Sequence, residues 1–289
     1  MKLFFLILVI ILIPFASVLA EEVIFIHEDE TGDDYGPGNY VYPLHPHFEP
    51  YEGLFDLQKF RVRAGEGIYY FDFTFGRITD PWDGFFGFTH PLVHLYIDNG
   101  EGGSTEPVKP VLEVKMNPEF PWNRAIVFSG WWIQGLKEGE EWRSPEEDVS
   151  WESPRPTSLE GSDLSVDGNT ITLEVPSEWT GPLEEARYYV LVGAYDPLDP
   201  YYFREISEQA SLWSFGGAEG EEGNHPIIDI LVPENFNQAE LLAQRDPVLK
   251  PIGPIPPEKV NYHALILISL FFLILIWGGY FSARQKKAS

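Results

Sequence analysis

The chain has 289 residues, 44% of them hydrophobic, with no cysteine and a formal net charge of −26. Such an acidic protein repels nucleic acid and anionic headgroups, so nucleic acid is excluded as a partner. Without cysteine the fold has no disulfides, but residues 21–245 are enough to bury a sizeable core.

The first 20 residues have the pattern of a signal peptide. Lys2 precedes an apolar run, Leu3–Phe15, and Val18, Leu19 and Ala20 supply a plausible cleavage point. We therefore expect residues 1–20 to direct export. Left uncleaved, the same segment would act as an N-terminal anchor.

An acidic turn follows, in which Asp29, Asp33 and Asp34 lie among the glycines Gly32 and Gly36. Clustered carboxylates repel one another unless a cation lies between them. Ca²⁺ prefers six to eight oxygen ligands, so it is the expected ion, in a structural role. The spacing does not fit an EF-hand loop. The alternative interpretation is a solvated turn with local hydrogen bonds from the aspartates.

The central part of the chain is predicted to be all-β. In Gly67–Phe75 the aromatic residues alternate with Asp72 and Thr74, which is the period of a half-buried strand. Several short strands separated by Gly, Pro and Asp turns favour an antiparallel β-sandwich over residues 21–245. The other predicted strands are Leu92–Asp98, Val111–Met116, Arg124–Trp131, Asn169–Val175, Arg187–Ala194 and Ile227–Val232.

Three segments have a different character. Glu138–Gly161 is acidic and poorly patterned, and we expect a long exposed loop there. Gln238–Arg245 reads as a short helix. Residues 246–262 are rich in proline, which keeps a chain extended and stiff, so they are predicted to form a stalk.

The C-terminal part has the pattern of a membrane anchor. Ala264–Phe281 is almost entirely apolar and long enough to cross a hydrocarbon core of about 30 Å, so residues 263–282 are predicted to form a transmembrane helix. Arg284, Lys286 and Lys287 follow it, which places residues 283–289 in the cytoplasm as a basic tail. The prediction is a single-pass cell-membrane protein with its bulk outside the cell.

The predicted external part is strongly acidic. Residues 21–262 contain 45 acidic and 15 basic side chains, a formal charge of −30. One interpretation is cation binding, and the other is a solvated surface that tolerates salt or heat.

Several sequence words resemble the glucodextranase-type C-terminal binding module, which is also found on pullulanases. The resemblance covers roughly Ile26–Pro254 in one consistent order. The matching words are GDDYGPGNYVYP at Gly32–Pro43, FDLQKF at Phe55–Phe60, DPWDGFFGF at Asp80–Phe88, LYIDNG at Leu95–Gly100, PWNRAIVFSGWW at Pro121–Trp132, YYVLVGAYDP at Tyr188–Pro197, SLWSFGG at Ser211–Gly217 and IIDILVP at Ile227–Pro233.

The resemblance implies a β-sandwich that binds a carbohydrate or a cell-envelope component without catalysis. It adds Asp56 and Asp98, which lie at strand ends within the matching words, to the candidate metal ligands. The loop Asp83–Phe86 departs from the glycine-rich, polar character of the family. No hydrolase domain accompanies the module, which implies a free-standing receptor or accessory subunit.

Aromatic side chains on predicted loops are the candidates for sugar binding, because flat rings match the apolar faces of sugar rings. Most aromatic residues of a sandwich simply fill its core, and Trp131 and Trp132 must point to opposite faces of their strand, so at least one is core. The candidates for a sugar platform are Trp82, Phe85, Phe86, Tyr201 and Tyr202, and Trp142 and Trp151 are further loop aromatics.

Histidines and catalytic motifs contribute little. On a strand, His90 and His94 would lie about 13 Å apart, too far to share one ion. His45 and His47 would share a face, as a zinc pair or as plain surface histidines. The sequence contains no nucleophile elbow, HExxH motif or phosphate-binding glycine loop, so we expect no enzyme.

Two functional hypotheses follow. The first is a membrane-tethered, noncatalytic module that binds α-glucan polysaccharide or oligosaccharide and is stabilised by Ca²⁺. The second is an envelope protein that contacts the S-layer or a neighbouring membrane complex. Exposed aromatic residues favour the first, whereas the acidic surface favours the second.

Overall fold

A computed structural model describes residues 21–100, 102–218 and 224–254. The chain separates after Pro254 into two units, and the second, Ile255–Ser289, lies outside the described residues. The predicted signal peptide (1–20), transmembrane helix (263–282) and basic tail (283–289) therefore all fall outside them. Within the described ranges, no helix has the length and apolar character needed to cross a bilayer.

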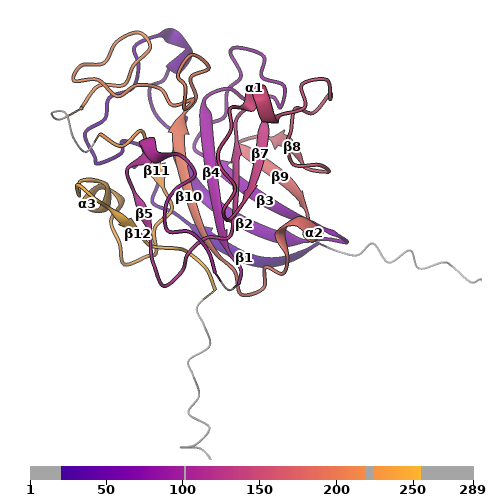
Figure 1. Cartoon of the computed structure of the whole chain (residues 1–289). Helices are drawn as coiled ribbons and strands as arrows, with labels where there is room; N and C mark the ends of the chain where they lie inside the picture. The colour runs from indigo at the N-terminus through magenta and orange to yellow at the C-terminus, as the bar shows by residue number, and fades with distance from the viewer. Residues whose placement is uncertain (1–20, 101, 219–223, 255–289) are drawn as a thin grey trace, which may run out of the picture. The chain divides into compact units, whose positions relative to one another are not determined.

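Two five-stranded antiparallel sheets pack face to face (Figure 1), which confirms the predicted all-β sandwich. The first sheet has the order β1-β2-β3-β9-β8 and the second β11-β10-β4-β6-β7. The strands of the first are β1 (Glu22–Glu28), β2 (Leu57–Ala64), β3 (Ile68–Phe75), β8 (Asp163–Asp167) and β9 (Thr170–Pro176). Those of the second are β4 (Pro91–Asp98), β6 (Arg124–Phe128), β7 (Ile133–Lys137), β10 (Arg187–Ala194) and β11 (Asp229–Ile230).

Smaller elements lie around the sandwich. Helices α1 (Pro145–Asp148), α2 (Ser177–Thr180) and α3 (Gln238–Leu242) are short, as are the 3₁₀ turns η1 (Pro46–Phe48) and η2 (Pro110–Leu112). A further pair of two-residue strands, β5 (Lys115–Met116) and β12 (Val248–Leu249), runs parallel.

Alternation of side chains explains why β3 is a central strand. Tyr69, Phe71, Phe73 and Phe75 all point into the core and are buried, as the period of two predicts. Their rings meet rings from the opposite sheet, since Phe73 and Phe128 lie 5.2 Å apart between centroids. Burial of this aromatic layer drives the two sheets together.

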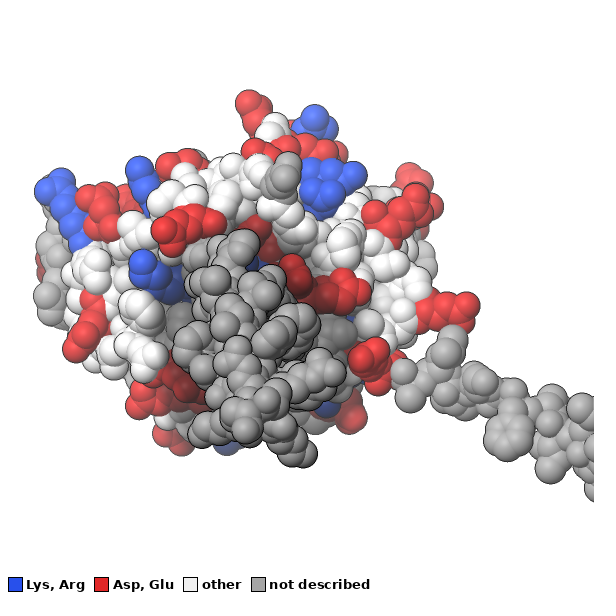
Figure 2. Space-filling model, turned by 90° about the horizontal axis from the view of Figure 1, so that it is seen from below, with Lys and Arg blue, Asp and Glu red and all other residues white. Residues whose placement is uncertain are grey.

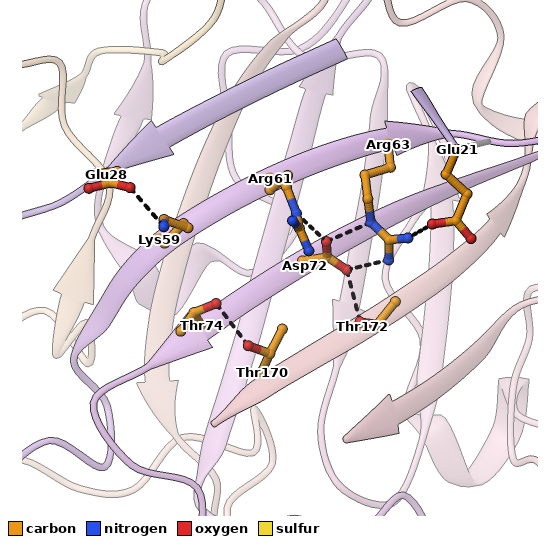
Figure 3. A network of polar contacts seen from close by, with 9 residues as sticks. All are labelled: Glu21, Glu28, Lys59, Arg61, Arg63, Asp72, Thr74, Thr170 and Thr172. Atoms are coloured by element: carbon orange, nitrogen blue, oxygen red, sulfur yellow. Dashed lines mark hydrogen bonds and ion pairs between the residues drawn. The ribbon is translucent and has the colours of Figure 1, made fainter. Parts of the chain in front are cut away.

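The outer face of the first sheet carries a polar network (Figure 3). The Asp72 carboxylate accepts hydrogen bonds from Arg61 Nε at 2.7 Å, from Arg63 Nε and Nη2 at 2.7 Å each, and from Thr172 Oγ1 at 2.8 Å. The two arginines cover Asp72, so it is buried although it faces outward. Hydrogen bonds to its charged form outweigh the effect of burial, and the pKa of Asp72 is lowered.

Two predictions about elements within the sandwich need correction. Val111–Met116 forms the turn η2 and the two-residue strand β5 rather than one strand. The segment 138–161 contains α1 and buries Val149 and Leu159, so it is not a wholly exposed loop.

The predicted stalk does not begin at residue 246. Val248 and Leu249 pair with β5, and Ile252 exchanges two backbone hydrogen bonds with Tyr188, at 2.7 and 2.9 Å. Residues 246–254 are therefore part of the module, because their apolar side chains Leu249 and Ile252 are buried against it.

Acidic side chains are spread over the surface. On the face shown in Figure 2 they are scattered between uncharged residues, with fewer basic side chains among them. The excess of acid seen in the sequence is therefore carried partly by the solvated surface. One group of carboxylates, in contrast, is drawn into the interior.

Candidate functional site

The buried carboxylate cluster forms where the edges of the two sheets meet. Asp29 follows β1, the edge strand of the first sheet, and its backbone N–H donates to Gln58 O at 3.0 Å. Asp33 lies in the turn that follows. Asp229 lies on β11, the edge strand of the second sheet. One carboxylate oxygen from each of these three residues lies within 4.8 Å of the others.

Oxygen atoms in this cluster lack hydrogen-bond donors. Asp29 Oδ2, Asp33 Oδ1, Asp34 Oδ1 and Asp229 Oδ1 are all buried with no partner. Asp229 has an exposed fraction of 0%, and its other oxygen, Oδ2, accepts a hydrogen bond from the Leu57 backbone N–H at 2.7 Å. A buried carboxylate oxygen without a donor is costly, and a cation removes that cost.

Asp34 and Asp56 hold the turn in place. Asp34 Oδ2 accepts from the Tyr42 hydroxyl and from the Gly53 backbone N–H at 3.1 Å. Both oxygens of Asp56 are satisfied, by the Gly32 backbone N–H at 3.0 Å and by Gln58 Nε2 at 2.7 Å. Asp56 is thus placed as a support of the acidic turn, and each of its oxygens already has a hydrogen-bond partner.

Burial and mutual repulsion act on these acids. Burial first, and the neighbouring carboxylates second, raise the pKa of Asp29 to about 8 and that of Asp33 to about 7. The same causes raise the pKa of Asp229 well above its ordinary value.

Asp98 is not brought to this cluster. It pairs with Arg187 at one end of β10, whereas Asp229 pairs with Val192, five residues further along the same strand. At the rise of a β-strand this separation is about 16 Å. Asp98 instead lines a groove of 690 Å³ with Glu119, Phe120, Glu184 and Arg187.

A second candidate site consists of His45, His47, Trp82 and Trp213, which we call the aromatic end. The ring of His45 stacks on Trp213, with 4.1 Å between centroids, and His47 lies 5.3 Å from Trp82. The two tryptophan rings are 6.2 Å apart. Trp213 is 45% exposed and Trp82 is half-buried, so part of each ring faces solvent.

Three loops build the aromatic end. Leu44 N–H donates to Ser211 O at 2.8 Å and His45 N–H to Leu212 O at 3.2 Å, which joins the segment before η1 to the loop that carries Trp213. The Trp82 loop is held by Gly130, whose carbonyl accepts from the Phe86 N–H at 3.0 Å. A Cβ on Gly130 would lie 1.7 Å from Phe88 O, so only glycine permits this approach.

The predicted sugar-platform residues are placed differently from one another. Trp82 lies in the aromatic end, and Phe85, in the same loop, is 59% exposed. Phe86 is only 4% exposed and Tyr202 only 5%, so neither offers a ring face to a ligand. Tyr201 is 39% exposed. Within the part of the chain that the structure describes, its ring does not stack on any ring of the aromatic end.

Tyr202 is buried next to the side chain of Lys109. Lys109 Nζ lies 4.0 Å from the Trp142 ring centroid and 5.2 Å from that of Tyr202, and it donates to Tyr201 O. The exposed fraction of Lys109 is 0%, and burial lowers its pKa well below the ordinary value. Trp142 and Tyr202 therefore form a cage for a side chain of the protein itself.

Sequence reasoning missed Asp229 and Trp213. The signal for Asp229 was present, because one acid interrupts an otherwise apolar strand in IIDILVP. Trp213 lies in the word SLWSFGG, but nothing in that word distinguishes an exposed ring from a buried one. Trp132 is buried, as the prediction that at least one of Trp131 and Trp132 is core requires. The prediction of opposite strand faces is wrong, because both residues follow the end of β6 at Phe128 and both pack against Tyr195.

Comparison with known protein families gives one match. Residues 24–250 match the family described as the C-terminal binding module, SLH-like, of glucodextranase. No curated protein matches the chain. The match runs from β1 to the end of β12 and agrees with the resemblance expected from the sequence words. The chain therefore belongs to the family of glucodextranase C-terminal binding modules.

Proposed function

We propose that the protein is a noncatalytic module that binds α-glucan-type carbohydrate at the cell surface, and that the aromatic end is its sugar-binding site. The observation that carries the proposal is the pair of partly exposed rings of Trp82 and Trp213, 6.2 Å apart and flanked by His45 and His47. Membership of a family of binding modules supports a binding role.

The chemistry of the aromatic end suits a sugar. Indole rings offer flat apolar area to the C–H face of a pyranose, and their edges leave its hydroxyls in water. The neighbouring side chains Leu44 and Leu212 are about half exposed and extend the apolar surface. The two histidine rings add polar nitrogen atoms at the rim.

Tethering and a bound ion complete the proposal. The apolar segment 264–281 with the cations after it supports attachment to the cell membrane, with the module outside and residues 283–289 in the cytoplasm. Separation of membrane and soluble fractions, with and without residues 263–289, tests this part. Bound Ca²⁺ is included as a structural ion, not as a ligand of the sugar.

Affinity electrophoresis in gels containing starch, pullulan or dextran tests sugar binding. We expect retardation of the wild type in at least one polymer, because an extended glucan presents many binding sites. Trp213→Ala and Trp82→Ala should each weaken binding about two- to tenfold, since a lost aromatic stack costs about 0.5–1.5 kcal/mol.

Trp151→Ala is the matched control, because Trp151 is 43% exposed and so resembles Trp213 in residue type and exposure. It should migrate like the wild type. Unchanged mobility of the wild type in every polymer would count against carbohydrate binding, and loss of retardation in Trp151→Ala alone would place the site elsewhere.

The second candidate is an envelope-associated role, and the description of the family as SLH-like supports it. In this alternative the module contacts the S-layer or a neighbouring membrane complex. Co-sedimentation with isolated surface-layer protein, in the absence of any shift by free glucan, would favour it over carbohydrate binding.

A further inference from the structure

We infer that Asp29, Asp33 and Asp229 bind a hard divalent cation, Ca²⁺ in the first place, and that this ion clamps the two sheets of the sandwich at their shared edge. The inference deepens the Ca²⁺ part of the proposed function and does not depend on carbohydrate binding. It keeps Asp29 and Asp33 of the expected ligand set, and Asp229 takes the place of Asp34, Asp56 and Asp98.

The first step concerns the free oxygen atoms. The three carboxylates each offer an oxygen, and these lie within 4.8 Å of one another. In each case a carboxylate oxygen is buried and has no hydrogen-bond partner: Asp29 Oδ2, Asp33 Oδ1 and Asp229 Oδ1. Asp34 Oδ1, on the adjacent residue, is unpartnered as well and adds negative charge.

The second step concerns Asp229, which distinguishes this cluster from a solvated acidic turn. Its side chain is wholly buried, and one oxygen is fixed by the Leu57 N–H at 2.7 Å. The other oxygen, Oδ1, is buried without a hydrogen-bond partner, and a carboxylate oxygen of Asp229 lies within 4.8 Å of one from Asp29 and one from Asp33. A solvated turn would leave its acids to water, whereas this one places a buried acid from a distant strand against them.

The third step concerns charge. Several carboxylates in one buried volume need compensation. No ion pair recorded among the described residues brings a lysine or arginine to Asp29, Asp33, Asp34 or Asp229. All the candidate ligand atoms are carboxylate oxygens, which Ca²⁺ and Mg²⁺ prefer over nitrogen or sulfur. Ca²⁺ fits the partly irregular turn better, because Mg²⁺ requires near-ideal octahedral geometry.

The fourth step concerns what the ion would hold together. Asp29 directly follows the edge strand of the first sheet, and Asp229 belongs to the edge strand of the second. Gln238 of α3 braces the same place, because its Oε1 accepts from Ile230 N–H and its Nε2 donates to Asp33 O, at 2.6 Å each. An ion at this point would connect β1, the acidic turn and β11.

Thermal unfolding and calorimetric titration of the purified chain with CaCl₂ test the inference. After removal of metal with EDTA, Ca²⁺ at about one hundred times its Kd should raise Tm by about 5 °C or more, because only the folded state binds the ion. Asp229→Asn keeps the size of the side chain and an acceptor for Leu57 N–H, and should reduce Ca²⁺ affinity at least tenfold. Asp33→Asn, in the half-buried turn, should do the same and serves if Asp229→Asn does not fold.

Asp98→Asn is the matched control, because it neutralises a buried acid at the other end of β10. It should keep the wild-type response to Ca²⁺. A Ca²⁺ response equal in wild type and in both cluster variants, or no response of the wild type to Ca²⁺, Mg²⁺ or EDTA, would overturn the inference. The titration contains no sugar, so its outcome and that of the glucan gels are independent.

Discussion

At the scale of single residues, the free-energy cost of burying an aspartate depends on its hydrogen-bond partners. Asp72 is buried beneath two arginines and is fully hydrogen-bonded, whereas Asp229 is buried with one oxygen unpartnered. Both acids lie within strands, and their sequences give no indication of the difference. The distinction arises from neighbours that are distant in the sequence, namely Arg61 and Arg63 for Asp72, and Asp29 and Asp33 for Asp229.

Replacement of Asp72 tests the outer-face network. Asp72→Asn should lower the free energy of unfolding by about 2–3 kcal/mol, because buried hydrogen bonds to Arg63 and Arg61 lose their charged acceptor. Denaturant unfolding at pH 7 measures it. The folded-state pKa of Asp72 is below the unfolded value, so the difference should persist above about pH 4 and disappear as the pH falls further.

A matched control for this network is Glu28→Gln, which removes the exposed ion pair with Lys59 on the same sheet. We expect no measurable change of stability there, since exposed pairs contribute little. Equal effects of the two substitutions would contradict the role given to burial.

Because His90 is buried in its neutral form, we expect the free energy of unfolding to fall in mild acid. It is buried beside Phe48 and Trp82, and burial lowers its pKa to about 3, against a smaller opposing effect of the His47 backbone. Arg204 and His47 also disfavour its protonated form. Between about pH 6.5 and pH 3 only the unfolded state takes up this proton, so stability falls as the pH falls, by up to about 1.4 kcal/mol per pH unit.

The measurement is denaturant unfolding between pH 7 and pH 4 for wild type and His90→Phe. The variant should show a shallower dependence on pH, because the titrating group is gone. Identical slopes would show that His90 is not responsible.

At the scale of elements, the sequence predicts strands well where one face is apolar. The alternation in β3 and the apolar runs of β4 and β10 correspond closely to observed strands. The strands β1, β2, β7 and β8 were not predicted. In β2 the side chains Lys59, Arg61 and Arg63 interrupt the apolar pattern, and β7 and β8 have only five residues each. Val111–Met116 was predicted as a strand from its pattern of apolar residues. Most of these residues are buried, but in a turn and a two-residue strand, which leave the same pattern in the sequence as a longer strand.

The candidate sites were less predictable than the fold. The acidic turn was visible as a local cluster, yet the third carboxylate of the cluster, Asp229, comes from β11, about 200 residues later. Phe86 and Tyr202 resemble exposed loop aromatics in sequence and are buried in the structure, the second against Lys109. Such placements depend on long-range packing, which local sequence patterns do not contain.

The proline-rich segment gives a prediction about the limit of the module. Ile252→Ala should lower the free energy of unfolding by about 2–4 kcal/mol, because Ile252 is buried and bridged to Tyr188. A free stalk at this position would tolerate the change.

Leu198→Ala is the control for that substitution, since Leu198 is 93% exposed. Its unfolding midpoint should match that of the wild type. If Ile252→Ala unfolds at the wild-type midpoint in the same denaturant series, residues 246–254 do not stabilise the module and the predicted stalk begins at residue 246.

At the scale of the whole molecule, two sheets carry two candidate sites with separate tasks. The cluster of Asp29, Asp33 and Asp229 lies at the sheet edges, and the aromatic end lies on loops. The segment from Asp34 to His45 connects them: the Tyr42 hydroxyl donates to Asp34, and Tyr42 packs against Phe55 and Phe215, each 5.4 Å away between centroids. This arrangement suits a rigid module that recognises a ligand on loops held by a stable framework.

Calorimetric titration of the purified, Ca²⁺-supplied chain with soluble α-glucan oligosaccharides, followed by analysis of the sugars, tests recognition without turnover most directly. The account predicts saturable heat of binding that Trp213→Ala weakens, with the oligosaccharides recovered unchanged. Absence of binding to every α-glucan, or new reducing ends produced by the protein, would contradict it.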